Sequence, residues 1–429
     1  MRRFFLLPIL VFILASCRSV EPGQVDFAWS GAVTDSSFAI VFMPLSAGRF
    51  EVQVRNGTEL VLEERVDTGA ELTPIRIDVP GLAASTEYTW SVNGAEGKAT
   101  TFASGAFSYS LAVGSCAESG SESPLFEQIA AREPLFYLQT GDFHYGDIET
   151  DCETAFPEYI GDVARSSTQR TLFRSAPFAY MWDDHDFGPN NSAGNAPCKR
   201  VAISSYRSLI PHYSTAFGGE NDPISQSFKA GRVRYVLTDL RSQKVRPTYD
   251  PNNACVRLTA GSNFGSEAHL QWFFDELLAA KREGQVVAWV SGIPWINAPG
   301  GPNYECGEDD DWGGYPEERT RIARFIQDND IPLFMLSGDA HMVALDDGSN
   351  VEGGFPVFHA APLDRRGSYK GGPYSHGYSA ESGQYGWITI VDAGGDSLRV
   401  DFSASNLKGN PVVNADGKAI QSSVVFKIN

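Results

Sequence analysis

The sequence predicts an α/β (α+β) protein with a β-rich region in front, and three observations support this fold class. From residue 25 to about 107, short apolar and β-branched runs alternate with turn residues and show no helical periodicity. From residue 109 onward, apolar strands alternate with amphipathic helical stretches, which indicates a buried sheet with helices on its faces. Several of these strands end in ligand-capable residues, and in open α/β sheets ligands bind at that end.

Residues 1–17 predict an export signal. Arg2 and Arg3 give a basic start, residues 4–14 form an apolar run too short to span a bilayer, and Leu14-Ala15-Ser16-Cys17 closes the segment. These last four residues resemble a bacterial lipobox, which implies lipidation of Cys17, with residues 18–24 as a tether. An ordinary secretory signal is the alternative, and export could use the twin-arginine or the Sec route. We therefore expect an exported bacterial lipoprotein, periplasmic and anchored to the outer membrane.

Residues 25–107 predict a small β-sandwich of the immunoglobulin or fibronectin-III type. Asn56-Gly57 and Asn93-Gly94 are hairpin turn signals between its apolar runs. The segment leading to Tyr88 looks like the tyrosine corner of fibronectin type III modules. Such a module either spaces and packs the next domain or binds a carbohydrate or partner, and we favour the first role.

The overall charge bears on possible partners. The chain has 53 acidic and 34 basic residues, a formal net charge of -19. This charge argues against nucleic acid as a partner, because the DNA backbone is also anionic. An anionic substrate would need local cations at its site. We expect a monomer that meets a membrane only through its lipid anchor.

Five cysteines remain after Cys17, an odd number for an exported protein, so one should stay unpaired. Cys116 is the exception on chemical grounds, because it follows a strand end. The other four allow three pairings, which the sequence does not distinguish; we favour Cys152 with Cys198 and Cys255 with Cys306.

Residues 108–429 hold the elements of the larger domain. We expect core strands over residues 108–113, 135–138, 178–182, 233–237, 286–290 and 333–336. Helices are expected over residues 125–132, 317–328 and from a cap at Ser266 to Lys281, and antiparallel strands from Tyr385 onward.

Four strand ends carry the chemistry. They read Gly114-Ser115-Cys116, Gly141-Asp142-Phe143-His144-Tyr145, Asp183-Asp184-His185-Asp186 and Gly338-Asp339-Ala340-His341. Charges this dense are costly to desolvate unless metals or hydrogen bonds pair them. One such end could be a solvated turn, whereas four predict a metal site.

These motifs resemble those of the calcineurin-type metallophosphoesterases, and more closely the PhoD-like alkaline phosphatases. Gly-Ser-Cys, Gly-Asp-x-x-Tyr, Trp-Asp-Asp-His-Asp and Gly-Asp-x-His are that family's variants, and Asp239-x-Arg241 matches a further motif. The similarity runs from about residue 107 to the C-terminus. It implies a four-layer αββα metallophosphoesterase sandwich and a phosphoesterase activity.

The ligand types predict two different metals. Cys116, Asp142, Tyr145 and His341 offer a thiolate, a carboxylate, a phenolate and an imidazole, which suit a transition metal and ferric iron in particular. Asp142, Asp184 and Asp339 form an all-oxygen set suited to calcium or magnesium, with Asp142 bridging both ions and Ile293 near the position of the superfamily's lone histidine. The resemblance implies the same pair, Fe(III) and Ca(II); Mg, Mn or Zn are the alternatives.

The remaining site residues would act on the substrate. His185 occupies the general-acid position, with Asp183 or Asp186 orienting its ring; a structural histidine is the alternative. Arg241 could grip phosphate bidentately, or form a salt bridge to Asp239. Asn190 and Asn191 could ligate the second metal or donate to phosphate, or serve only as turn residues. For the acidic run over residues 308–311 we favour a solvated loop over a calcium site.

The sequence therefore predicts a phosphoesterase that hydrolyses phosphomonoesters, phosphodiesters or both by attack of a metal-activated hydroxide, for phosphate acquisition. A phospholipase or phosphodiesterase acting on lipid headgroups is an alternative within the enzymes. A non-enzymatic surface lipoprotein that retains the fold is the alternative outside them.

Overall fold

The computed structural model describes residues 21–70, 72–296, 306–307 and 309–428. The predicted signal peptide and Cys17 lie outside the described residues. Within these ranges, no helix is long and apolar enough to cross a membrane.

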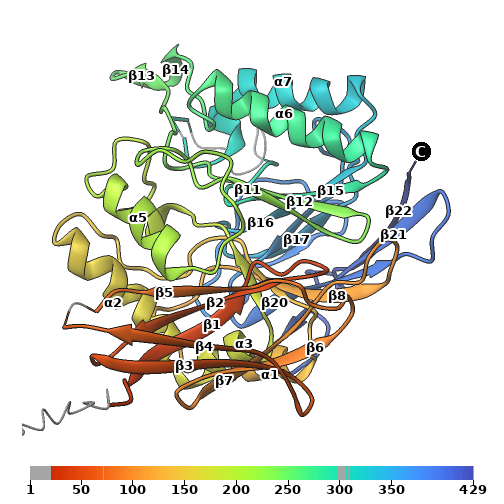
Figure 1. Cartoon of the computed structure of the whole chain (residues 1–429). Coiled ribbons are helices and arrows are strands. Elements are labelled where there is room, and N and C mark those ends of the chain that lie inside the picture. Colours follow the sequence, from red (N-terminus) through yellow and green to blue (C-terminus); the bar gives the residue numbers. More distant parts are fainter. Residues whose placement is uncertain (1–20, 71, 297–305, 308, 429) are drawn as a thin grey trace, which may run out of the picture.

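Two large sheets lie face to face in the centre of the molecule, and helices cover them above and below (Figure 1). The larger sheet has nine strands in the order β22 (Ser422–Lys427), β21 (Ser397–Asn406), β20 (Gln384–Val391), β8 (Tyr109–Gly114), β9 (Tyr137–Gln139), β10 (Phe178–Tyr180), β1 (Val25–Gly31), β2 (Phe38–Pro44) and β5 (Ile75–Val79). The strands β8, β9 and β10 run parallel, so their carboxyl ends meet at one edge. The predicted antiparallel C-terminal strands are confirmed in β20 to β22.

The second sheet has seven strands, of which β12, β15, β16 and β18 are parallel neighbours. Its order is β11 (Gln226–Ala230), β12 (Val233–Thr238), β15 (Val286–Ser291), β16 (Leu333–Ser337), β18 (Val357–Ala360), β17 (Val343–Asp346) and β19 (Tyr378–Ser379). Aromatic side chains join the two sheets: the Phe402 ring lies 5.4 Å from Phe334 and 5.8 Å from Phe358, centroid to centroid. The sheets therefore share one core.

The helices form because their apolar residues recur on one face. In α6 (Glu267–Arg282), the Ser266 side chain accepts a hydrogen bond from the His269 amide and caps the helix as predicted. Phe273 and Leu277 of α6 are fully buried and pack over the second sheet, beside α7 (Pro316–Asp328). The other helices are α1 (Leu125–Ala131), α2 (Cys152–Arg165), α3 (Ser167–Ser175), α4 (Asp184–Phe187) and α5 (Lys199–Leu209), with a 3-10 turn η1 (Trp312–Gly314).

The N-terminal strands divide between two sheets. β1, β2 and β5 belong to the nine-stranded sheet, because Gly31 of β1 pairs with Phe178 of β10. β4 (Glu59–Thr68), β3 (Gly48–Asn56), β6 (Glu87–Val92) and β7 (Ala95–Thr100) form a separate four-stranded sheet that packs on them, for example through Phe42 and Phe50, whose ring centroids are 5.2 Å apart. The nine-stranded sheet thus crosses the boundary predicted near residue 107, and β1 covers an edge of β10 that would otherwise be open.

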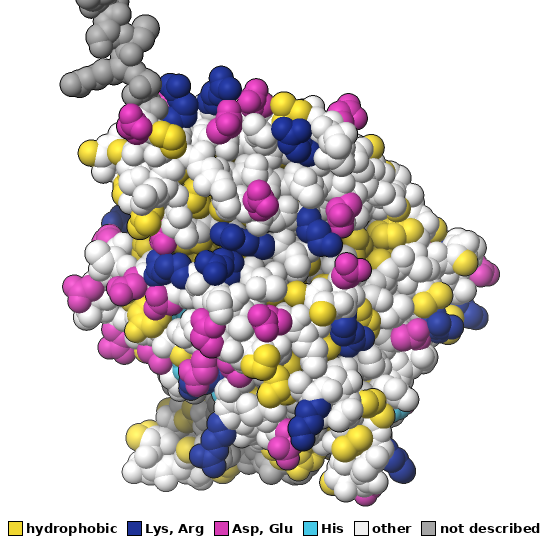
Figure 2. Space-filling model, turned by 90° about the horizontal axis from the view of Figure 1, so that it is seen from below, with side chains coloured by type: hydrophobic (Ala, Val, Ile, Leu, Met, Phe, Trp, Pro, Cys, Tyr) yellow, Lys and Arg dark blue, Asp and Glu magenta, His cyan; other side chains and the backbone are white. Residues whose placement is uncertain are grey.

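The underside of the molecule is formed by this four-stranded sheet and by α1 to α3 (Figures 1 and 2). The hairpins predicted at Asn56-Gly57 and Asn93-Gly94 are confirmed as the β3–β4 and β6–β7 connections. The Tyr88 hydroxyl accepts a hydrogen bond from the Ala83 amide at 3.0 Å, back along the chain.

The favoured cysteine pairing is confirmed. Cys152 is bonded to Cys198 and Cys255 to Cys306, while Cys116 is free and buried. The second disulfide joins the small hairpin of β13 (Thr248–Asp250) and β14 (Asn253–Thr259) to the loop before η1.

Candidate functional site

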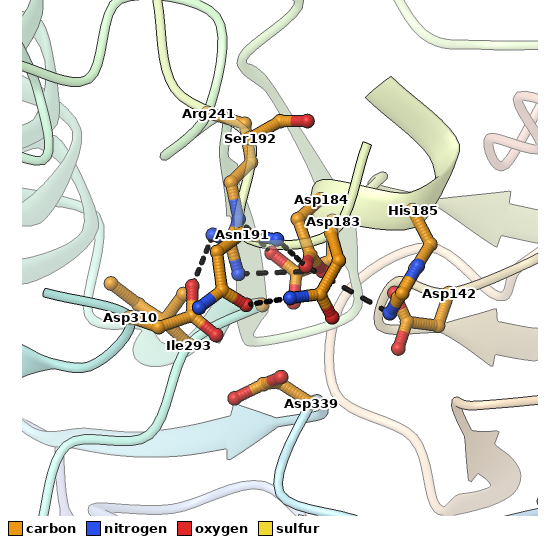
Figure 3. Close-up of polar contacts among 12 residues, drawn as sticks. Asp142, Asp183, Asp184, His185, Asn191, Ser192, Arg241, Ile293, Asp310 and Asp339 are labelled. Atoms are coloured by element: carbon orange, nitrogen blue, oxygen red, sulfur yellow. Dashed lines mark hydrogen bonds and ion pairs between the residues drawn. The ribbon is translucent and has the colours of Figure 1, made fainter. Parts of the chain in front are cut away.

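The polar strand ends converge at one place between the two sheets. Asp142 follows β9, Asp183 and Asp184 follow β10, and Asp339 follows β16 of the other sheet. Figure 3 shows these carboxylates pointing into a common space, with Asp339 opposite Asp183 and Asp184. The local sequence makes this possible: a Cβ added to Gly141 would lie 2.5 Å from the Asp183 Cβ, so only glycine lets the two loops approach this closely.

The predicted iron ligands lie together. Cys116, Asp142 and His341 each offer one ligand atom, and these atoms lie within 4.8 Å of one another. The Tyr145 hydroxyl donates to Asp142 Oδ2 at 2.7 Å and lies 2.9 Å from His341 Nε2. His341 Nδ1 lies 2.8 Å from the Arg366 carbonyl oxygen, which leaves Nε2 facing the group. A thiol, a phenol, a carboxyl and an imidazole therefore surround one point.

The predicted calcium ligands also lie close, but in two overlapping groups. Asp142, Asp184 and His185 form one, and Asp183, Asp184 and Asp339 form the other, again with ligand atoms within 4.8 Å. Asp142 is shared with the iron set, as predicted for a bridging ligand. Asp183 belongs to the site as a candidate ligand, a role that the sequence did not suggest.

The carboxylates have the unsatisfied oxygens expected of metal ligands. Asp142 Oδ1, Asp183 Oδ2 and Asp184 Oδ1 are buried without a hydrogen-bond partner among the described residues. Burial, together with the neighbouring carboxylates, raises the pKa of Asp142 and Asp183, and raises that of Asp339 to about 6. Cations placed between these carboxylates would bind the unpaired oxygens and offset the repulsion between the buried negative charges. The donor set therefore fits bound metal ions.

The backbone is strained at the same residues. Cys116, Asp142, Asp339 and His341 all adopt the left-handed conformation, with φ between 42° and 59°. Non-glycine residues rarely adopt it, and such positions cluster where a structure must aim side chains at a ligand.

His185 is held by a residue that the sequence did not identify. Its Nδ1 lies 2.7 Å from Asp147 Oδ1, and its Nε2 lies 3.9 Å from Asp184 Oδ2. The prediction that Asp183 or Asp186 orients the ring is therefore wrong. A signal was present in the sequence, because Asp147 follows the Gly-Asp-x-x-Tyr motif by two residues.

Asp186 serves the backbone instead. Its Oδ1 accepts from the amides of Phe143 and His144 at 2.6 and 2.9 Å, and its Oδ2 accepts from the Asp183 amide at 3.0 Å. The residue is buried, and these three bonds tie the loop after β9 to the loop after β10. The structure therefore gives Asp186 a positioning role in place of the predicted catalytic one.

Arg241 is fully buried among carboxylates. Its Nε donates to Asp183, its Nη1 donates to Asp310 Oδ1 at 2.5 Å, and its Nη2 lies 3.6 Å from Asp184 Oδ1 (Figure 3). The alternative salt bridge to Asp239 does not form, because Asp239 Oδ1 accepts the backbone amide of Arg241 instead. In this structure Arg241 positions the ligand carboxylates, and these ion pairs would have to break before it could grip a phosphate.

Asp310 corrects the prediction of a solvated acidic loop. It is only 2% exposed. Burial opposes its ionisation, but Arg241 and the nearby lysines 370 and 244 hold its pKa below the usual range. The charge run alone could not reveal this, since the arginine that pairs with it lies far away in sequence.

Lys370 places a cation beside the ligand carboxylates. Its Nζ donates to Asp339 Oδ2 at 2.8 Å and to Asp310 Oδ2 at 3.4 Å, and about a third of its side chain is exposed. Burial lowers its pKa, but Asp339 and Asp310 raise it further, so the amine stays protonated. It lies in a loop without periodicity, which is why sequence analysis missed it.

The two asparagines lie beside the second ligand group. The Asn191 amide donates to Asp184 Oδ2 at 2.5 Å, and the Asn190 side chain donates to Asn191 Oδ1 at 2.9 Å. Asn191 thus fixes a predicted ligand through its backbone. Ile293 is fully buried beside Asp310 in the close-up (Figure 3), and its side chain offers no ligand atom.

Comparisons with solved structures show the same fold in known phosphatases. Among solved structures, one described as the structure of PhoD matches with a TM-score of 0.67 and 16% identity, covering 94% of this chain and 90% of the other. A purple acid phosphatase from yellow lupin (Lupinus luteus) seeds matches with a TM-score of 0.56 and 11% identity, covering 94% and 74%. At these identities the matches show the fold. No curated protein gives a match to this chain.

A match to a family profile shows to which protein family the chain belongs. The profile of the PhoD-like phosphatases matches residues 111–363, more than half of the chain, and this range includes the strand ends that bear Cys116, Asp142, Asp184, Asp339 and His341. The chain belongs to the PhoD-like phosphatase family.

Proposed function

We propose that this protein is an exported, metal-dependent phosphoesterase that hydrolyses phosphomonoesters, phosphodiesters or both. Membership of the family indicates a hydrolase acting on phosphate esters. One observation carries the two-metal chemistry: Asp142 groups with Cys116 and His341 on one side and with Asp184 on the other, and Asp184 also groups with Asp183 and Asp339. Two adjacent cation sites sharing a carboxylate form the arrangement that two-metal phosphoryl chemistry uses.

The metals we propose are Fe(III) beside Cys116 and Tyr145, and Ca(II) beside Asp184 and Asp339. Thiolate and phenolate donors favour a transition metal in its ferric state. Carboxylate oxygens alone favour calcium. Asp142 would be the shared ligand, and its contacts support this role: one oxygen is bonded by Tyr145 and the other is unpartnered among the described residues.

The chain's own residues account for the remaining requirements of the reaction. When bound, the metals polarise phosphate oxygens and lower the pKa of water. His185 holds a proton at Nε2 for the leaving oxygen, and Asp147 fixes Nδ1 and so the direction of the ring. Lys370 offers an ammonium group to the phosphate, while Arg241 keeps Asp183 and Asp310 in place. Asn191 orients Asp184.

A substrate panel with parallel metal analysis tests this function. Asp142→Asn should lose metal and hydrolysis of mono- and diesters together, because both ligand groups use this residue. Asp78→Asn, at an exposed ion pair with Arg76 on β5, is the matched control and should lose neither. Wild-type protein that holds both metals yet hydrolyses no ester would instead support the non-enzymatic surface lipoprotein.

We further propose export and a lipid anchor at Cys17. Two disulfides between described cysteines support an oxidising compartment. Cys17→Ser should release the protein into the soluble periplasmic fraction or leave it unprocessed. A wild-type protein that is already soluble and carries no lipid at its new N-terminus would contradict the anchor.

For residues 25–107 we propose an immunoglobulin or fibronectin-III-like module that packs against the catalytic domain in a monomer. Two observations support this assignment. Three strands of the segment lie in one sheet and four in the sheet that faces it, and the Ala83 amide donates a hydrogen bond to the Tyr88 hydroxyl.

A further inference from the structure

A second pocket lies away from the metal ligands, on the underside of the molecule. It has a volume of about 700 Å³ and lies between the four-stranded sheet and α3. Strands β3, β6 and β7 contribute one wall and the C-terminal part of α3 the other. None of the candidate metal or catalytic residues lines it.

The pocket is cationic in a strongly acidic protein. Arg55, Lys98 and Arg174 line it, against the single acidic residue Glu96. Lys98 is paired with Glu87 at 3.2 Å and with Glu133 at 3.8 Å, but neither Arg55 nor Arg174 forms an ion pair with any described residue. Figure 2 looks onto this underside and shows Lys and Arg side chains gathered near its middle. With a net charge of -19 on the chain, such a surplus of positive charge is a local feature.

Two buried donors in the pocket have no acceptor. Trp90 is 1% exposed, and its Nε1 has no hydrogen-bond partner among the described residues; the Nε of Arg174 is likewise buried and unpartnered. Buried N–H groups are rarely left unsatisfied, because each costs the free energy of its lost hydration. Burial lowers the pKa of Arg174 most, the charge of Arg170 one turn earlier in α3 lowers it further, and the charge of Glu96 opposes both.

Gly97 places the indole edge at the pocket. A Cβ added there would lie 2.2 Å from Cζ2 of Trp90 and 2.6 Å from Cε2, the carbon bonded to Nε1. The same Cβ would lie 2.9 Å from the Arg174 carbonyl oxygen. Glycine thus lets strand β7, the indole N–H and α3 come together without a side chain between them.

We propose that this pocket binds a phosphate group, as a site separate from the catalytic centre. An oxyanion would accept hydrogen bonds from Trp90 Nε1 and Arg174 Nε, and Arg55 would add charge. Lys98 is neutralised by its own acidic partners, and the two unpaired arginines, Arg55 and Arg174, exceed Glu96 by one charge, so the lining favours an anion. The group could come from free phosphate or from the headgroup of a phospholipid, since both present the same oxygens.

Calorimetric titration of the full chain carrying Cys17→Ser, which prevents acylation, tests the proposal. The two probes are inorganic phosphate and dihexanoyl phosphatidylglycerol below its critical micelle concentration. Arg174→Gln should weaken the binding at this pocket by about 10-fold or more, as expected for a charge-assisted hydrogen bond. Trp90→Phe keeps an aromatic ring, loses only the N–H donor, and should weaken it by about 5-fold.

Arg65→Gln is the matched control: it removes an arginine of the same sheet that is already paired with Glu51 at 2.9 Å, so binding should stay unchanged. Ester hydrolysis reports the fold of every variant and should also stay unchanged. Weaker binding of both probes supports a site for the phosphate group itself, and weaker binding of the lipid alone supports a headgroup site. Wild-type affinities for both probes in Arg174→Gln and Trp90→Phe would overturn the proposal.

Discussion

Replacing Asp147 by asparagine tests how much the orientation of the His185 ring contributes to catalysis while His185 itself is kept. Asp147 Oδ1 lies 2.7 Å from His185 Nδ1, a charge-assisted bond if the ring is protonated. Buried bonds of this kind contribute about 1.5–3 kcal/mol, but the Asp147 side chain is 45% exposed, so solvent reduces the figure to about 1 kcal/mol. Asp147→Asn should therefore lower kcat by about 5-fold. His185→Asn removes the proton donor itself and should cost about 10²-fold.

The assay compares aryl and alkyl phosphate esters, because only poor leaving groups need a proton. Both variants should slow alkyl esters more than aryl esters and should keep their metal content. Glu149→Gln, an exposed carboxylate two residues from Asp147, is the matched control and should behave as wild type. An equal loss on aryl and alkyl esters would refute the role of His185 in protonating the leaving group, and wild-type kinetics in Asp147→Asn would refute the positioning role of that carboxylate.

Three further predictions follow from the site. Ferric iron bound to a phenolate absorbs visible light, so Tyr145→Phe should weaken the colour of the purified protein. Asp184→Asn or a calcium chelator should remove activity and leave the colour. A colourless, active protein that contains zinc would contradict the metal assignment. Lys370→Met should raise KM about 10-fold with little change in metal content, unlike the exposed Lys418→Met, and an unchanged KM would remove Lys370 from phosphate binding. In the metal-free protein, burial raises the pKa of Asp186 to about 7 and that of Asp339 to about 6, so their contribution to stability is present below about pH 4 and is lost as pH rises through 6–7. The Tm of metal-free protein should therefore rise on acidification from pH 8 to 5. Bound metal should weaken this trend, because it removes the contribution of the ligand Asp339; parallel curves for the two forms would count against the carboxylate cluster.

The sequence revealed the ligands because each lies directly after an apolar strand. Cys116, Asp142 and Asp184 follow strands that are parallel neighbours, and parallel strands bring their carboxyl ends together whatever the intervening chain does. Asp147 and Lys370 could not be identified this way. Their positions depend on loops that carry no period, and only the folded structure shows which side chains those loops approach.

The extent of the nine-stranded sheet was hidden for a similar reason. The strands of residues 25–107 were recognisable from alternation and Asn-Gly turns, which are local signals. The pairing of β1 with β10 joins residues 31 and 178, and nothing in either strand specifies the other. Helix α2 was missed as well: Pro157 lies inside it, and a proline within an apolar pattern argues against a continuous helix.

The distribution of charge around the ligands explains how so many carboxylates can share one buried place. Arg241 pairs with Asp183 and Asp310 behind the site, and Lys370 pairs with Asp339 and Asp310 at its side. Asp142 and Asp184 each keep a buried oxygen without a hydrogen bond. Arginine and lysine thus offset part of the negative charge of the cluster, while, among the described residues, one oxygen each of Asp142, Asp183 and Asp184 stays without a hydrogen bond where a metal ion would bind. In the proposed function, cations held at these oxygens would reverse the local sign of the charge, so that a phosphate ester could approach an acidic protein at this site.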